Sequence, residues 1–158
     1  MVGGDADAFD KAHGVLSAMG KKTVHAGGHG AGQAAKICNN MLLGATMIAT
    51  CESFQLAKKL GLDAQVFFDI ASNASGQTWS MTTYCPVKGV GPQSPADNDF
   101  AGGFASALML KDLGLAMQGA KGVNAQVPMG ELAAKWFEMH CEEGNAGMDF
   151  SSIINRLA

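Results

Sequence analysis

Charged residues are scarce in this chain of 158 residues, where Asp, Glu, Lys and Arg make up 16% of the sequence. An average globular domain has about 25%. Lys and Arg number 11 against 14 Asp and Glu, so the formal net charge is −3 and no basic excess exists to neutralise phosphates. These numbers exclude nucleic acid as the main partner. Hydrophobic residues make up 47%, which excludes a disordered chain.

Cysteine and proline are also rare. The four cysteines form no CxxC pair and fall short of disulfide-like density, which is typical of a protein from a reducing compartment. The start of the sequence is acidic and has no apolar run, so we do not expect a signal peptide. The longest uncharged run in the middle of the chain, residues 37–51, is too short and too polar to span a membrane. We therefore expect no membrane partner.

The abundant residue types favour an α-helical fold built around one long helix. Apolar positions are mostly Ala, Leu and Met, which favour helices over sheets. Residues 31–60 lack proline and repeat apolar side chains every three or four positions, which predicts a single helix of about 45 Å. Because a small domain is only about 30 Å across, other helices wrap this one or it extends into a second subunit. Shorter helices are predicted at residues 6–18, 64–73, 104–121, 128–143 and near the C-terminus, with a short extended piece at residues 23–26 and an irregular segment at residues 74–103.

The sequence therefore predicts an all-α fold, with one multi-helix domain over residues 1–158 around a long central helix.

The glycines just before this helix suggest a dinucleotide-binding fingerprint, because Gly30-x-Gly32-x-x-Ala35 matches GxGxxA. The fingerprint needs an acidic residue after a second strand, whereas Glu52 lies inside the helical pattern. We reject it, and infer instead that these glycines allow close backbone approach at a helix N-terminus.

Lys36 and Asn40 are candidates for chemistry on the long helix. They lie four residues apart on one face, which Asn39 shares. A lysine is disfavoured near the positive N-terminal end of a helix, and asparagines are poor helix formers. A solvated lysine beside a polar seam would explain this pattern without function. Alternatively, an amine held there partly out of water gives up its proton readily and serves as an acid or base, with Asn40 orienting an oxygen beside it.

Other polar groups have simpler explanations. Lys111 and Asp112 lie in an apolar helical segment, where adjacent charges usually extend to the surface. The four histidines show no zinc-ligand spacing, so we expect no metal site. The ten methionines are better explained as core residues than as a cofactor site.

Residues 28–40 resemble the catalytic signature of the β-hydroxyacid dehydrogenase family. They read GHGAGQAAKICNN, which matches the family pattern GxGxGxxxKxxNN. Residues 104–116 resemble the second motif of this family. Residues 75–80 and 84–90 resemble its 3-hydroxyisobutyrate dehydrogenase branch. The resemblance covers essentially the whole chain.

The resemblance implies a fold and a domain arrangement. The chain corresponds to the C-terminal all-α domain found in 6-phosphogluconate and β-hydroxyacid dehydrogenases, which supplies catalysis and dimer contacts. The N-terminal Rossmann domain that holds most of the NAD(P) is implied to be absent, so we expect the isolated chain to be inactive. Residues 2–4 resemble the end of the junction motif that holds the substrate carboxylate.

The resemblance also implies a reaction, the oxidation of 3-hydroxyisobutyrate to methylmalonate semialdehyde with NAD⁺ in valine degradation. Lys36 would be the acid/base, Asn40, Gly3 and Gly4 would bind substrate, and Lys111 would contact the cofactor. NADP in place of NAD, or another small 3-hydroxy acid as substrate, stays an open alternative. The implied partner is a second copy, as a homodimer or higher homo-oligomer, in a bacterial cytoplasm or a eukaryotic mitochondrial matrix. The competing hypothesis is a dimerisation module without enzymatic function.

Overall fold

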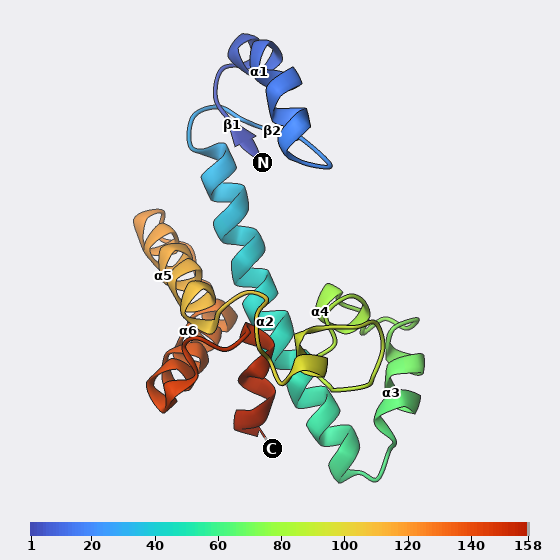
Figure 1. The fold of residues 1–158 in the computed structure, drawn as a ribbon. Coiled ribbons are helices and arrows are strands. Elements are labelled where there is room, and N and C mark those ends of the chain that lie inside the picture. Colours follow the sequence, from blue (N-terminus) through green and yellow to red (C-terminus); the bar gives the residue numbers. More distant parts are fainter. Residues whose placement is uncertain (158) are drawn as a thin grey trace. The chain divides into compact units, whose positions relative to one another are not determined.

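A computed structural model describes residues 1–157 of the chain (Figure 1). They form two compact units, Met1–Asn40 and Met41–Ala158. Helix α2 (Ala31–Lys59) contributes residues to both units, and its 29 residues confirm the long helix that the apolar repeat predicts. No helix in residues 1–157 combines the length and the apolar character that a membrane crossing requires.

The first unit begins with two short parallel strands. Strand β1 (Val2–Gly3) pairs with β2 (His25–Gly27), and helix α1 (Ala6–Met19) connects them. Parallel strands need a crossover of a dozen or more residues, which α1 provides. Asp5 caps this helix, because its carboxylate accepts a hydrogen bond from the Ala8 N–H at 3.2 Å.

This parallel sheet makes the expected all-α class wrong. A βαβ unit is the building element of parallel-sheet nucleotide-binding folds, so the chain is not purely a helical C-terminal domain. The strands are two and three residues long, which is too short for an alternating apolar pattern to show. Only the pairing of β1 with a segment more than 20 residues away reveals them.

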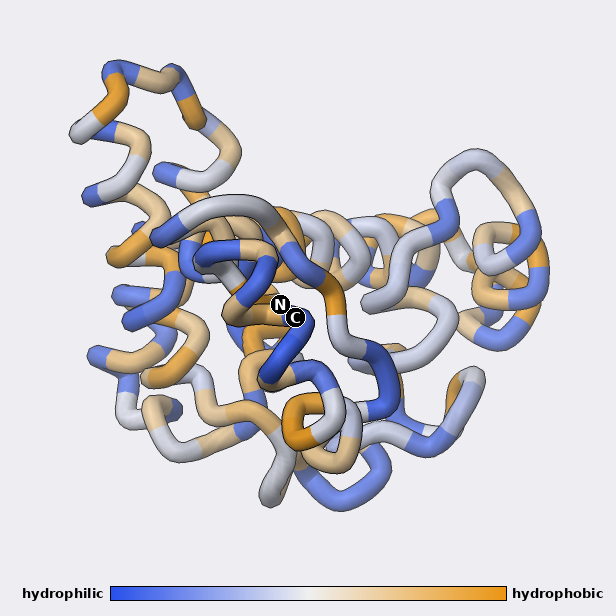
Figure 2. The backbone as a smooth tube through the Cα atoms, turned by 90° about the horizontal axis from the view of Figure 1, so that it is seen from above, coloured by the Kyte–Doolittle hydropathy of each residue, from blue (hydrophilic) through white to orange (hydrophobic). Residues whose placement is uncertain are grey.

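The second unit is helical. After the C-terminal part of α2 come α3 (Ala64–Ala71), α4 (Trp79–Thr82), the short 3₁₀ helix η1 (Pro95–Asn98), α5 (Ser106–Gly122), α6 (Pro128–His140), the π-helical turn η2 (Cys141–Asn145) and the 3₁₀ helix η3 (Phe150–Leu157). Apolar and polar residues alternate around the helical coils (Figure 2). The apolar sides form one main core, made of Met47, Ile48, Cys51, Met109, Leu113, Ala133, Phe137, Phe150, Ile153 and Ile154.

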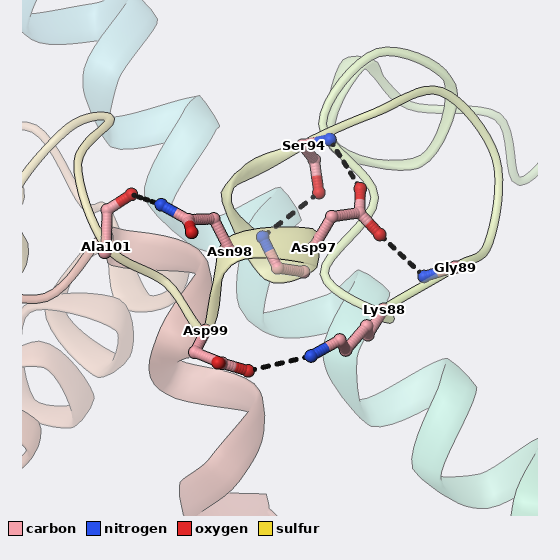
Figure 3. A network of polar contacts seen from close by, with 8 residues as sticks. Lys88, Gly89, Ser94, Asp97, Asn98, Asp99 and Ala101 are labelled. Carbon is pink, nitrogen blue, oxygen red and sulfur yellow. Dashed lines mark hydrogen bonds and ion pairs between the residues drawn. The ribbon is translucent and has the colours of Figure 1, made fainter.

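Side-chain caps order the irregular segment around residues 88–101 (Figure 3). The Asp97 carboxylate accepts hydrogen bonds from the Gly89 N–H at 2.7 Å and the Ser94 N–H at 2.9 Å. These two bonds hold the pKa of Asp97 below its usual range. Lys88 forms an ion pair with Asp99 at 2.9 Å. The segment is thus held by local polar contacts rather than by regular helix or strand.

A buried carboxylate ties three distant segments of this unit together. Asp149 is fully buried and accepts hydrogen bonds from the Tyr84 hydroxyl at 2.8 Å, the Phe104 N–H at 2.7 Å and the Ser151 N–H at 2.9 Å. Burial and the neighbouring carboxylate raise the pKa of Tyr84, so its hydroxyl stays a donor. We infer that Asp149 anchors the segment before η3 to the two others.

Candidate functional site

Strand β1 lies in direct backbone contact with the first turn of α2. A Cβ on Gly3 would lie 2.7 Å from the Gly32 nitrogen, and a Cβ on Gly32 would lie 2.9 Å from the Gly3 nitrogen. Glycine is therefore required on both sides of this contact. Gly30, with φ of +85°, makes the left-handed turn into the helix. The close backbone approach predicted from the glycine-rich sequence is confirmed.

We expect Gly32→Ala to break this contact. Its Cβ would meet backbone atoms of β1, which cannot move away as a flexible side chain can. Amide hydrogen exchange should show loss of protection in residues 2–4 and 25–27. Gly14→Ala is the matched control, because nothing lies within 4 Å of a Cβ there and alanine favours the helix. Equal protection in the two variants would contradict the assigned contact.

The end of β1 is held by a residue that the sequence analysis did not select. The Gly4 N–H donates to the Gly27 carbonyl at 2.9 Å, and His25 Nε2 bonds the Gly4 carbonyl at 2.8 Å. The His25 ring also stacks on Phe9 with ring centroids 4.8 Å apart. His25 therefore positions the Gly3–Gly4 backbone. The only sequence signal was its place in the predicted extended piece, because its partner is 21 residues away.

Lys36 and Asn40 lie one turn apart on α2, as their spacing predicts. Asn39 Nδ2 donates to Asn40 Oδ1 at 3.0 Å, which fixes the orientation of the Asn40 amide. Asn40 is half-buried, whereas Lys36 is exposed. The expected partial removal of Lys36 from water is therefore not found in this chain. Residue 32, one turn before it, is glycine and offers no side chain to shield the amine.

The two units contain different candidates. Gly3, Gly4, Lys36 and Asn40 belong to the first unit, and Lys111 belongs to the second. Lys111 lies on α5 with its side chain 61% exposed and its Nζ 3.7 Å from Oδ1 of Asp112. Asp112 is buried, so this pair places one charge at the surface and one in the interior.

The first unit has an arrangement suited to an anionic group. In open parallel sheets, ligands bind at the carboxyl ends of the strands. Here those ends are Gly3–Gly4 and Gly27, and the chain continues from Gly27 into the N-terminus of α2. Backbone N–H groups at a helix N-terminus favour anions. Across residues 1–157, no group of three or more His, Cys, Asp or Glu side chains is arranged to hold a metal ion.

Comparison with known proteins gives a consistent result. Residues 30–157 match the family model described as NAD-binding of NADP-dependent 3-hydroxyisobutyrate dehydrogenase. Over 97% of this chain, the sequence is 49% identical to 3-hydroxyisobutyrate dehydrogenase of Pseudomonas aeruginosa. Over 99% of this chain, it is 44% identical to the NAD-dependent L-serine dehydrogenase of that organism. It covers 52% of each relative, so the chain spans about half the length of the curated relatives it matches.

A solved structure agrees in fold. A Mycobacterium tuberculosis 3-hydroxyisobutyrate dehydrogenase, described with L-serine, superposes with a TM-score of 0.95 at 48% identity, over 99% of this chain and 54% of that one. The NAD-binding description of the matched region is a second finding against a purely helical C-terminal domain. With a family model matched over most of its residues, the chain belongs to the 3-hydroxyisobutyrate dehydrogenase family.

Proposed function

We propose that this chain is part of an NAD(P)-dependent dehydrogenase that oxidises 3-hydroxyisobutyrate to methylmalonate semialdehyde in valine degradation. The observation that carries the proposal is the position of Lys36 and Asn40 on the helix that begins at the carboxyl end of β2. A parallel sheet offers ligand sites at this edge. Lysine supplies a group that exchanges protons, and the amide supplies a hydrogen-bond donor.

Each candidate residue has a defined task in this reaction. The Gly3–Gly4 backbone binds the substrate carboxylate, and Asn40 binds the hydroxyl oxygen. The neutral amine of Lys36 takes the hydroxyl proton while the carbon–hydrogen bond breaks and the carbonyl forms. NAD, when bound, supplies the acceptor for the hydride. Asn39 acts through Asn40, because its hydrogen bond fixes the Asn40 amide.

The exposure of Lys36 adds a requirement. An acid or base works best out of bulk water, and this chain alone leaves the residue exposed. We propose that a Rossmann domain, in the half of the relatives' length that this chain does not match, holds most of the cofactor and covers Lys36. Lys111 contacts the cofactor in the same proposal. The isolated chain is then the catalytic and dimerisation part, with no turnover by itself.

Substrate preference tests the proposed reaction. We expect kcat/KM for 3-hydroxyisobutyrate to exceed that for 3-hydroxypropionate, L-serine and tartronate by roughly tenfold or more, because 3-hydroxypropionate lacks the methyl group, L-serine carries an amine in its place, and tartronate has its hydroxyl on a different carbon and no hydroxymethyl group. The measurement is steady-state kinetics of the complete enzyme with NAD and with NADP. A higher kcat/KM for L-serine would instead assign the second candidate, a serine-type dehydrogenase, which the L-serine dehydrogenase relative favours.

We also propose that the protein works as a homodimer or higher homo-oligomer, in a bacterial cytoplasm or a mitochondrial matrix. Helices α2 and α6 carry large hydrophobic side chains that are more than 40% exposed, namely Leu42, Leu56, Met129 and Leu132. Monomers rarely expose such side chains in a contiguous patch. Self-association accompanies the enzyme activity in this proposal and does not replace it.

A further inference from the structure

Histidine is divided unevenly between the two units. His13, His25 and His29 belong to the first unit, and His140 is the one histidine in the sequence of the second. Histidine is the side chain whose ordinary charge change falls between about pH 5 and about pH 8. His140, however, is only 1% exposed. In the second unit, the ordinary histidine titration therefore falls on a buried ring.

The ring of His140 connects the end of α6 to η2 and η3. Asn145 Nδ2 lies 3.5 Å from His140 Nδ1 and can only donate, so Nδ1 accepts and Nε2 carries the proton. Nε2 then donates to the Ser152 hydroxyl at 2.7 Å, and Ser152 is fully buried. A second proton, on Nδ1, would face the Asn145 NH₂ group, which offers no lone pair. The contact between α6 and η3 therefore suits the neutral ring and opposes the charged one.

The charged groups beside this ring are paired with each other. Arg156 of η3 donates from Nε to both carboxylate oxygens of Glu143 in η2, at 3.0 and 3.1 Å. Burial is the largest influence on the pKa of His140 and lowers it, while Glu143 raises it and Arg156 lowers it. Glu138 of α6 and Glu142 of η2 are exposed, where water and salt screen their charges. The Arg156–Glu143 pair thus offers an imidazolium no net compensating charge.

The remaining titratable groups around the ring are also engaged or neutral. Burial raises the pKa of Cys141, the next residue, so it stays a neutral thiol. On α5, which packs against α6, η2 and η3, the charged groups of Lys111 and Asp112 lie 3.7 Å from each other. Asp149, which precedes η3, accepts hydrogen bonds from the three donors described above. Within residues 1–157, a charged His140 would be a buried cation without a carboxylate of its own.

We propose that His140 makes the docking of η3 pH-dependent: protonation of its ring in mild acid shifts η3 from the docked position on α6 and η2 toward an undocked one. The undocked ring, open to water, has the ordinary histidine pKa of about 6.5, and the docked ring has a lower one. Docking is therefore fully favoured above about pH 6.5 and weakens as the pH falls below that value. One proton changes this equilibrium by at most about tenfold per pH unit. The inference does not depend on the proposed reaction.

Hydrogen exchange of the η3 amides measures this equilibrium. The unchanged 158-residue chain is compared at about pH 7.5 and about pH 5.5, with each exchange rate divided by the intrinsic rate at the same pH. Protection of residues 150–157 should fall severalfold at the lower pH, up to about tenfold. Protection of residues 41–59, the part of α2 in the second unit, should stay nearly constant, because the effect is local to η3.

His140→Gln removes the titration and keeps an amide donor for the Ser152 hydroxyl. We expect protection of η3 in this variant to be the same at both pH values. The matched control is His13→Gln, which makes the same change at an exposed histidine of α1. It should show the full loss of protection at the lower pH. Circular dichroism checks that both variants keep their helices.

An NMR titration of the unchanged chain is a second measurement that needs no variant. The His140 ring should titrate below about pH 6.5, and a ring that titrates at or above that value would overturn the proposal. Constant η3 protection in the unchanged chain would overturn it too, as would an equal loss of protection in His140→Gln. An equal loss in α2 would mean that the whole unit loses stability, which contradicts a local effect. None of these readouts uses dehydrogenase activity.

Discussion

We expect Lys36→Ala in the complete enzyme to lower kcat by about 10²–10⁴-fold, which is the usual effect of removing a positioned acid or base. KM for NAD should change little, because Lys36 acts on the substrate hydroxyl in the proposed reaction. Lys36→Arg should lower kcat by almost as much, because a guanidinium does not deprotonate in a protein. Steady-state kinetics over a range of pH measure both effects.

The matched control is Lys21→Ala, which removes an exposed lysine that follows α1 in the same unit. We expect kcat in this variant to equal that of the unchanged enzyme. An unchanged kcat in Lys36→Ala would remove the catalytic assignment. A rise in KM for NAD with kcat preserved would move Lys36 from proton transfer to cofactor binding.

The second large effect is expected at Asp149. Asp149→Asn replaces an accepting oxygen by an NH₂ group that donates, so at least one of the facing donors at Tyr84, Phe104 or Ser151 loses its partner inside the core. Hydrogen bonds to buried charged groups are strong, and a donor left without an acceptor is costly. We expect the free energy of unfolding to fall by about 3 kcal/mol or more, as measured by urea denaturation.

Two variants separate this network from a general effect of lost charge. Asp97→Asn changes a solvent-accessible carboxylate that caps two backbone N–H groups, and its effect should be much smaller. Tyr84→Phe removes one donor and leaves the Asp149 carboxylate with its others, so its effect should lie between the two. Equal losses for Asp149→Asn and Asp97→Asn would contradict the anchoring role.

Local sequence was informative where the chemistry is local. Residues 28–40 indicated the family, and the comparisons confirm it. The apolar repeat predicted the long helix to within one residue of its observed end, Lys59. The roles of Lys36, Asn40, Gly3, Gly4 and Lys111 stay predictions, because neither the fold nor the comparisons test what these side chains do.

The remaining features depend on contacts between residues far apart in the chain. Apolar periodicity predicted helices and missed the βαβ unit, because β1 becomes a strand only through pairing with β2. The sequence left open whether Lys36 is solvated or partly removed from water, because helix position describes a residue's neighbours along the chain and says nothing about what covers it, and the structure shows it exposed. The hydrogen bonds of His25 and Asp149 were also not predicted, because their partners are distant in the sequence and no local pattern indicates them. Thus the sequence by itself determined the family and the helices, since both rest on neighbouring residues. Tertiary structure alone decided the strand pairing, the glycine contact and the buried carboxylate, since each joins segments that meet only after folding.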